Sequence, residues 1–554
     1  MPNILTPVSL WNNFDDSLEL NAEKVFEGVY NGLRVERVTF FGRDTGSGRV
    51  KIAAAFAGDV SSPNGTVLIL PDSSETIDIE TVKFFVNRGY SALMVDYRGE
   101  SSGCEFYTLY PENISYANSE KCGRYKDFVD DSADKTSWYE WVAVGLYARK
   151  YILERTGKDN VAVVGIRDGG ELAWKLAVAA DFKCIIPVCA AGWKAYGNVS
   201  KYAQEEVTMD EERYRFIAGV DSQAYAPYVK CPVLMLCSTN DEKFDYDRAY
   251  DTFSRINPNF VKESAIAYSM QCHAVIGSTG VNDMFLFLDR NLKNRQVFIP
   301  KPVEVFVELD DDSNLIARTA FDEQGVVEKC DVFLAEDSTD SAVREWAACP
   351  VKDESKHQYF LNIYEKVSTI FVICRVKYLN GFTVWSKVAV KKISGKFRNM
   401  QTKFRVVYSD KNGTDGFSVS DSKSKAVGGI FLADDTVMPK LVTKARGIAG
   451  IYSKLGLTTY RMSNPQYSAN STNLLSIDMY CDNDSKLTLT FRNVSTGEDY
   501  VCNVAVVGGV WQSSVFESKS FKTSGGAPMS DFTGDLKFTV TCSAEFAVNN
   551  IMWL

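Results

Sequence analysis

The chain has 554 residues, a formal net charge of -10 at pH 7 and a pI near 5.1. A chain of this length exceeds what one hydrophobic core usually supports, so two to four domains are expected. The acidic balance argues against nucleic acid or an anionic membrane surface as the main partner, because both require clustered lysine and arginine.

The first 20 residues lack a positive segment followed by an apolar one, and nowhere do about 18 uncharged apolar residues run together. We therefore expect no signal peptide and no membrane span, and a cytoplasmic protein unless a leader was removed. The 13 cysteines are odd in number and scattered, without the paired spacing of zinc sites. Reduced, buried thiols are expected, with neither a metal nor a cofactor.

The first 295 residues predict a mostly parallel sheet that opens with an antiparallel hairpin. Apolar runs at 35–42 and 50–56 flank a turn whose glycines permit positive φ angles. Short continuous apolar strands then alternate with longer amphipathic segments, as in a sheet covered by helices on both faces. The strands are expected at 66–70, 92–95, 161–164, 184–188, 233–237 and 264–268, and the helices at about 76–88, 138–155, 170–180, 246–255 and 281–292.

One segment of this domain, residues 193–228, is polar and irregular. It lies between two strands, where sheets of this type carry a cap or lid over the site. A packed surface insertion fits the same pattern.

The rest of the chain is expected to be all β. Residues 296–395 predict an immunoglobulin-like sandwich, with strands that include 303–308, 359–364, 370–378 and 382–390. Residues 396–554 predict a jelly-roll-like sandwich, with strands at 475–480, 486–492, 500–507, 535–542 and 546–554.

A strand, a glycine-rich turn and a helix meet at Gly165-Ile166-Arg167-Asp168-Gly169-Gly170. In a nucleophile elbow the turn is too tight for side chains on either side of the nucleophile. Gly165 and Gly169 fill these flanking positions, so Arg167 falls where a nucleophile would stand. A guanidinium stays protonated and offers only donors, so it cannot attack an acyl carbon. Shifting the frame by one makes Asp168 the nucleophile but places Ile166 where a small residue is needed.

Two further candidate catalytic positions follow along the chain, first an acid and then a base. The strand at 233–237 ends in Ser238-Thr239-Asn240-Asp241, and the strand at 264–268 is followed by Gln271-Cys272-His273. The only other histidine, His357, lies in a charged loop of the middle β region. A lone histidine or aspartate is usually structural, but the order and position together favour Asp241 as an acid and His273 as a base.

Residues 24–293 resemble the α/β-hydrolase superfamily, and most closely its acetyl xylan esterases and dienelactone-hydrolase-like carboxylic ester hydrolases. The resemblance rests on residues 95–103, on the elbow 165–170, and on Cys231-Pro232-Val233 leading to Asp241. It implies Asp241 as acid and His273 as base, whereas the family's serine has no counterpart at Arg167.

A second departure follows the first parallel strand, where these enzymes usually carry His-Gly or Gly-Gly beside the oxyanion. This chain has Pro71-Asp72-Ser73-Ser74-Glu75. The other oxyanion donor would be the amide of Asp168. Carboxylates near both donors oppose the charge of a tetrahedral intermediate.

Three roles are open for Arg167. It could fork with Asp241 as a structural plug, which we favour, or offer a fixed cation to a carboxylate or phosphate ligand. Hydrolysis could also persist through water activated by His273, because losing a nucleophile leaves some rate from binding and positioning.

Residues 509–516 and 546–554 resemble jelly-roll modules attached to carbohydrate-active enzymes. An exposed Trp or Tyr would stack on sugar faces, and Trp511 and Tyr467 are the candidates, with Trp511 as the candidate ligand contact. Strand aromatics are more often buried, so Trp511 and Trp553 are expected in the sandwich core. Strand edges or loops of the two sandwiches could alternatively join copies of the chain.

The sequence thus supports three hypotheses. The first is a catalytically impaired ester-hydrolase homologue with a binding or assembly role. The second is an active carboxylic ester hydrolase on acylated carbohydrate or a similar small ester. The third is a self-assembling structural protein. A small ester or carbohydrate ligand and a homo-oligomer are the partners left open, and neither nucleic acid nor a membrane is expected.

Overall fold

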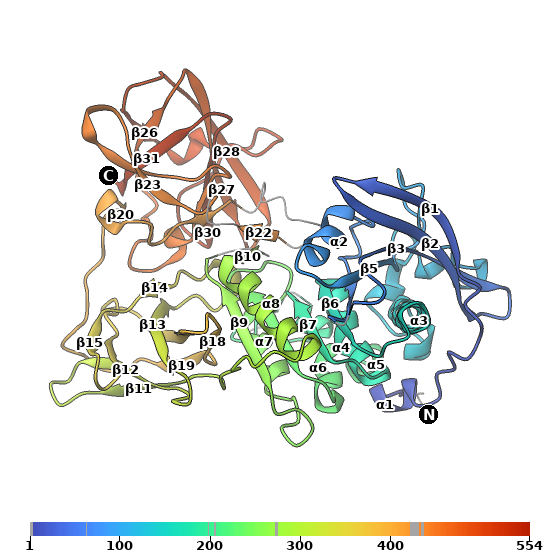
Figure 1. Ribbon diagram of the computed structural model, residues 1–554. Helices are drawn as coiled ribbons and strands as arrows, with labels where there is room; N and C mark the ends of the chain where they lie inside the picture. Colours follow the sequence, from blue (N-terminus) through green and yellow to red (C-terminus); the bar gives the residue numbers. More distant parts are fainter. Residues whose placement is uncertain are drawn as a thin grey trace.

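A computed structural model describes the chain in seven stretches of sequence. Figure 1 shows an α/β part that carries the N-terminus and, beside it, two all-β parts that follow in chain order. None of the helices in these stretches is long and apolar enough to cross a membrane. The described residues are 4–62, 64–197, 199–203, 206–271, 275–420, 431–433 and 437–554.

The α/β part is built on one nine-stranded sheet with the order β1-β2-β3-β5-β4-β6-β7-β8-β9. Antiparallel pairs join β1, β2, β3 and β5, and parallel pairs join β5 through β4 to β9. The crossover that places β4 between β5 and β6 gives the strand order of an α/β hydrolase, so this prediction is confirmed. The strands are β1 (Glu23–Tyr30), β2 (Leu33–Asp44), β3 (Arg49–Ala57), β4 (Thr66–Leu70), β5 (Ser91–Asp96), β6 (Val161–Ile166), β7 (Cys184–Val188), β8 (Val233–Ser238) and β9 (Ser264–Ser269).

The central strands β4 to β8 are buried along their whole length, which requires cover on both faces of the sheet. Helices supply that cover in two groups, one with α2 and α8 and the other with α3 and α4. The ring of Phe84 on α2 packs 5.1 Å from Phe285 on α8, and Leu176 on α4 lies against Gly145 on α3. The main helices are α2 (Ile79–Val86), α3 (Ser137–Thr156), α4 (Asp168–Ala179), α7 (Tyr246–Phe253) and α8 (Ser278–Leu292).

The sequence suggested that the segment 193–228 is irregular, but part of it is helical. It contains helix α5 (Glu211–Gly219) and the short helix α6 (Ser222–Tyr225). The Asp210 carboxylate caps α5 by accepting a hydrogen bond of 2.9 Å from the Arg213 amide, and Phe216 is buried. The cap and a few buried contacts outweigh the low apolar content of this helix.

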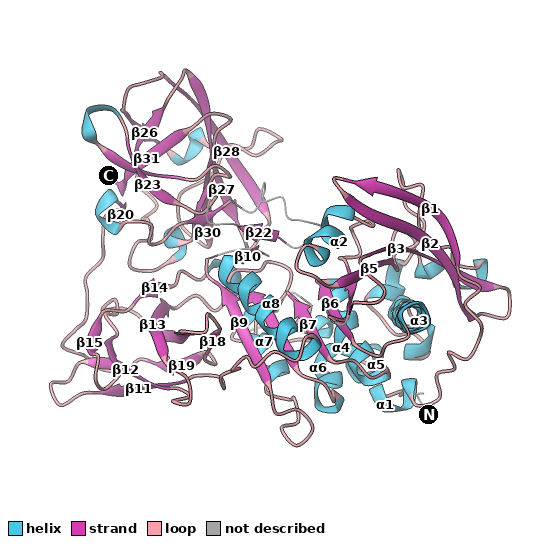
Figure 2. Cartoon of the chain, in the orientation of Figure 1, coloured by secondary structure: helices cyan, strands magenta, loops and turns pink. Residues whose placement is uncertain are grey.

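The middle part is a β-sandwich of two antiparallel sheets, which Figure 2 shows as the strand-rich region beside β9. The expected strand at 382–390 is divided into β18 and β19, and the expected strand at 359–364 is only the short β16. The strands are β11 (Glu304–Leu309), β12 (Leu315–Ala320), β15 (Val351–Asp353) and β16 (Gln358–Phe360) in one sheet, and β13 (Val327–Glu336), β14 (Ala347–Ala348), β17 (Thr369–Tyr378), β18 (Thr383–Trp385) and β19 (Ala389–Lys392) in the other.

The C-terminal part is a second β-sandwich with a separate hydrophobic core. The predicted order of fold classes, one α/β domain followed by two sandwiches, is confirmed. The strands are β20 (Val406–Tyr408), β23 (Lys440–Thr443), β24 (Ala449–Tyr452), β26 (Leu475–Cys481), β29 (Gln512–Phe516) and β31 (Phe546–Trp553) in one sheet, and β21 (Ser418–Val419), β25 (Leu457–Thr459), β27 (Ser485–Asn493), β28 (Glu498–Val506) and β30 (Leu536–Thr541) in the other.

Both sandwiches are attached to the α/β part. The middle sandwich shares one continuous core with it, and Tyr268 of β9 packs 5.4 Å from Trp385. The Arg344 guanidinium forms a fork with the Asp247 carboxylate at 2.7 and 2.8 Å, and both side chains are fully buried. The C-terminal sandwich is joined through a parallel pairing of β10 (Val275–Gly277) with β22 (Phe431–Ala433).

Candidate functional site

The turn between β6 and α4 has Arg167 at its tip. Its backbone adopts φ 51° and ψ -113°, a conformation that is costly for any residue other than glycine. A Cβ at Gly165 would lie 2.1 Å from the Gly169 carbonyl oxygen, and a Cβ at Gly169 would lie 2.1 Å from that of Leu70. These contacts explain the glycine spacing on both sides of Arg167, whereas Asp168 is already the first residue of α4.

The Arg167 side chain lies beside Asp241, which follows β8. One guanidinium nitrogen, Nη1, is 3.6 Å from Asp241 Oδ1, and the two side chains are 10% and 0% exposed. Burial opposes the charge of Arg167, but the carboxylate of Asp241 and the other acidic groups nearby together outweigh burial and raise the arginine pKa. The two residues therefore meet, but through a single long ion contact and not through the expected fork.

The base position cannot be placed in this arrangement, because His273 lies outside the described residues. Asp241 Oδ1 accepts a hydrogen bond of 2.8 Å from the Lys243 amide, which fixes the loop after β8. His357 lies in a turn of the middle sandwich, where its ring packs 4.7 Å from Phe321.

The Asp72 carboxylate occupies the backbone donors next to the elbow. Its Oδ1 accepts hydrogen bonds from the amide of Ser73 at 2.9 Å and from the amide of Asp168 at 3.4 Å, and its Oδ2 accepts one from the Ser74 hydroxyl at 2.8 Å. In ester hydrolases of this fold, amides at these two places face the oxyanion. Here a carboxylate of the chain itself lies against them.

Asp168 is held by two lysines from distant segments. Lys126 Nζ is 2.6 Å from Asp168 Oδ2, and Lys194 Nζ is 2.8 Å from Oδ1. Burial alone would raise the pKa of this carboxyl, but Lys194 and Lys126 outweigh burial and hold it well below its usual range. The Ser73 hydroxyl donates to the same carboxylate and accepts a hydrogen bond of 3.0 Å from Lys126. Sequence reasoning missed both lysines, since neither lies in a motif.

The segment 193–228 is fastened to α4 by a second buried cluster. Glu171 accepts hydrogen bonds from the Gly192 amide at 2.8 Å and from the Ser222 hydroxyl. Lys175, 2% exposed, donates to Ser222 at 3.3 Å, and burial lowers its pKa to about 8. Burial, reinforced by the charge of Glu171, raises the pKa of Asp221 to about 7. Residues 193, 194, 197 and 199 of this segment line the cavity above the elbow, so the segment forms one wall of the site.

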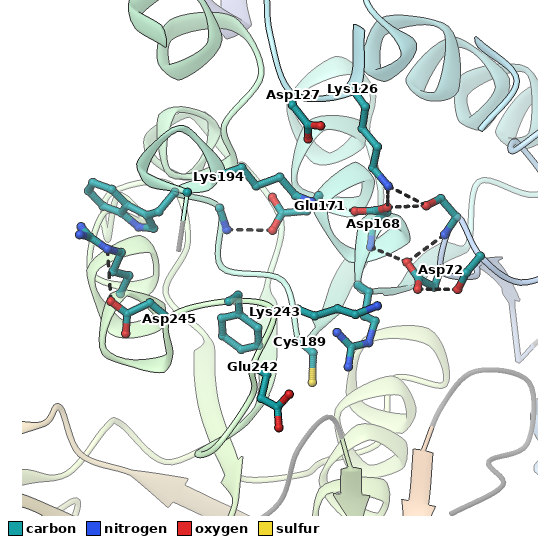
Figure 3. A pocket seen from close by; sticks show the side chains of 18 of the residues that line it. Asp72, Lys126, Asp127, Asp168, Glu171, Cys189, Lys194, Glu242, Lys243 and Asp245 are labelled. Carbon is teal, nitrogen blue, oxygen red and sulfur yellow. Dashed lines mark hydrogen bonds and ion pairs between the residues drawn. The ribbon is translucent and has the colours of Figure 1, made fainter. Parts of the chain in front are cut away.

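A cavity of about 520 Å³ lies above the elbow, and Figure 3 shows charged side chains around it. Among the residues that the structure describes, no group of three or more His, Cys, Asp or Glu side chains is arranged to hold a metal ion. The cavity is lined by Asp72, Ser73, Ser74, Lys126, Asp127, Arg167, Asp168, Glu171, Cys189, Gly192, Trp193, Lys194, Gly197, Val199, Glu242, Lys243, Phe244, Asp245 and Arg248.

The aromatic residues singled out in the C-terminal sandwich do not line this cavity. Trp553 belongs to the sandwich core, as expected, and its indole donates to the Tyr467 carbonyl at 2.6 Å. Trp511 is half-buried, with its ring 5.5 Å from that of Tyr480 and its edge against Gly450. A sugar contact at Trp511 stays a prediction.

No protein-family model matches the chain, and no curated protein matches it in sequence. Among solved structures, an acetyl xylan esterase from Thermoanaerobacterium sp. is similar over 52% of this chain and 94% of its own, with 15% identity and a TM-score of 0.38. An acetyl xylan esterase from Paenibacillus sp. R4 matches over 52% and 92%, with 14% identity and a TM-score of 0.37. The acylaminoacyl peptidase of Pyrococcus horikoshii matches over 50% of each chain, with 15% identity and a TM-score of 0.34. Similarity at this level carries no information about substrate or activity.

Proposed function

We propose that this chain is a small-molecule-binding protein that keeps an ester-hydrolase scaffold without hydrolysing esters. The observation that carries the proposal is the Asp72 carboxylate, which accepts hydrogen bonds from the amides of Ser73 and Asp168. Donors aimed at the developing oxyanion are usually the largest single contribution to acyl transfer. A carboxylate fixed against these donors occupies the space of an oxyanion and repels its charge.

The elbow adds a second obstacle to hydrolysis. Its tip carries Arg167, whose guanidinium has no lone pair to offer a carbonyl carbon. Asp168, the neighbouring carboxylate, is engaged by Lys126, Lys194 and the Ser73 hydroxyl. A carboxylate that accepts this many charged and polar hydrogen bonds is a weak nucleophile.

The cavity supports the binding part of the proposal. Its volume of about 520 Å³ falls in the range of about 300–1,000 Å³ that is usual for small-molecule pockets. One wall comes from the segment 193–228, which hydrogen bonds to α4 hold in place.

One observation favours a second candidate, an active ester hydrolase that uses Ser73. The Ser73 hydroxyl lies 3.0 Å from Lys126 Nζ, and serine–lysine pairs act as nucleophile and base in some hydrolases. Here the lysine amine donates to both Ser73 and Asp168, so it has no lone pair directed at the serine proton. We therefore rank this candidate second.

Two reagents test the proposal on the full-length chain: a fluorophosphonate probe and an aryl acetate. We expect neither labelling nor turnover above that of an unrelated folded protein. Clear turnover that is lost in His273→Ala would overturn the proposal in favour of a water-based mechanism at the old site. Labelling or turnover that is lost in Ser73→Ala would overturn it in favour of the second candidate.

A further inference from the structure

We infer that the ligand of this cavity carries an oxyanion, a carboxylate or a phosphate group, that binds between Arg167 and Lys243. The inference rests on the proposed binding function and names the chemical class of its ligand. Most carboxylates that line the cavity already have hydrogen-bond or ion-pair partners, whereas the side chains of two lining cations make no hydrogen bond in the described part of the chain.

The lining carboxylates close to the elbow are already engaged. Asp168 has two lysines, and Asp72 accepts hydrogen bonds from two amides and a hydroxyl. Glu242 lies 2.6 Å from Lys537, and Asp245 lies 3.3 Å from Arg248. Asp127 is exposed, and Figure 3 places it far from Lys243 in that view. Asp168, Glu242 and Asp245 are therefore each paired with a cation. Among the described residues, Asp72 is held only by neutral donors and keeps its charge beside the elbow amides.

Two lining cations have donors to spare. Within the described stretches, the Arg167 side chain makes no hydrogen bond, and its one ion contact, at 3.6 Å, is longer than a hydrogen bond. The Arg344 guanidinium, by comparison, donates hydrogen bonds to both carboxylate oxygens of Asp247, at 2.7 and 2.8 Å. A guanidinium that is nine-tenths buried and so weakly engaged is costly, and an anionic ligand would remove that cost.

Lys243 supplies the second cation. Its side chain is exposed and has no ion pair or hydrogen bond in the part of the chain that the structure describes, whereas its backbone amide is fixed by Asp241. Figure 3 shows this side chain extended toward the end of the cavity where Asp72 and Asp168 lie. Both Lys243 and Arg167 line the same cavity, and the proposed oxyanion lies between them.

The cavity is much larger than an inorganic anion, so we expect an organic acid or a phosphorylated metabolite. Calorimetry on the full-length chain at low salt compares glucuronate with glucose 6-phosphate, and uses glucose as the uncharged control. Binding of glucuronate alone assigns a carboxylate, binding of glucose 6-phosphate alone assigns a phosphate, and either result supports the inference. Equal binding of glucose would overturn it, as would the absence of binding by both anions at about 10 mM, where even weak sites fill.

Variants locate the binding. Arg167→Gln and Lys243→Gln should each weaken the binding of the anion about ten- to a hundredfold, because each removes a charged hydrogen-bond donor. Lys262→Gln is the matched control: Lys262 is an exposed lysine of the same domain outside the cavity, and its loss should leave the dissociation constant unchanged. Affinity that is unchanged in Lys243→Gln, or lowered equally in Lys262→Gln, would overturn the inference even if Arg167→Gln fails to fold.

Failure of this inference and failure of the proposed function give different results. Esterase activity that depends on His273 or Ser73 would refute the binding-protein proposal, whatever anions bind. An inert protein that binds neither anion would refute only the ligand class.

Discussion

Removing the Asp72 carboxylate should raise esterase activity only in a variant that carries a nucleophile at position 167. This dependence tests whether Asp72 blocks the oxyanion donors. Arg167→Ser restores a hydroxyl at the elbow but leaves the amides of Ser73 and Asp168 bonded to Asp72 at 2.9 and 3.4 Å. Loss of one oxyanion donor costs an ester or peptide hydrolase about 10²–10³ in kcat, or about 3–4 kcal/mol. Adding Asp72→Gly to Arg167→Ser should therefore raise aryl acetate turnover at least about a hundredfold.

The assay compares initial rates and fluorophosphonate labelling of the single and double variants, with circular dichroism to confirm folding. Asp72→Asn in the same background keeps an oxygen near the amides but removes the charge, so its gain should be smaller than that of Asp72→Gly. Adding His273→Ala to the double variant should abolish the gain. If Arg167→Ser alone were as active as the folded double variant, Asp72 would not block the oxyanion donors.

Three further predictions concern stability, measured by urea unfolding of the full-length chain. Burial raises the pKa of Glu336 to about 7 and that of Asp96 to about 6, so between about pH 4.5 and 7 the unfolded chain releases protons that the folded chain keeps. The free energy of unfolding should fall as the pH rises through this window, and Glu336→Gln should flatten the fall; a rise would contradict the prediction. Arg344→Met leaves the buried Asp247 without its cation and should cost about 3–5 kcal/mol, most of which Asp247→Leu should restore; a cost below about 1 kcal/mol would count against it. Gly169→Ala places a Cβ against the Leu70 carbonyl and should cost about 3 kcal/mol, whereas Gly277→Ala meets no atom within 4 Å and should cost little; equal costs would show that the elbow is not tightly packed.

The parts of the fold that could be predicted depend on local patterns. β4 and β7 have the expected bounds because each is a short apolar run enclosed between segments of different pattern. The elbow was recognisable because Gly165 and Gly169 are required by backbone contacts within a few residues and with the end of β4. β1 was missed because its apolar residues Val25 and Val29 face solvent between charged neighbours, so no buried face marks the strand.

The parts that could not be predicted depend on contacts between distant segments. Lys126 and Lys194 meet at Asp168 from two short 3-10 helices, at positions 68 residues apart, and no spacing rule connects them. The fork expected between Arg167 and Asp241 depends on the separation of β6 from the loop after β8, which sequence order does not fix to within an ångström. The prediction that Asp241 lies near Arg167 holds, but at 3.6 Å its carboxylate is too far away to form the expected hydrogen-bonded fork.

The loop after β8 shows why the sandwiches matter to the site. Three consecutive residues are tied to three different parts of the protein. Asn240 donates to the Arg344 carbonyl of the middle sandwich at 2.8 Å, Asp241 faces Arg167, and Glu242 lies 2.6 Å from Lys537 of the C-terminal sandwich. The backbone that carries Lys243 is therefore held from both sides. Because donors fixed before binding lose less freedom when a ligand arrives, this arrangement favours a preorganised anion site, and it gives both sandwiches a role in the pocket that requires neither sugar binding nor self-assembly.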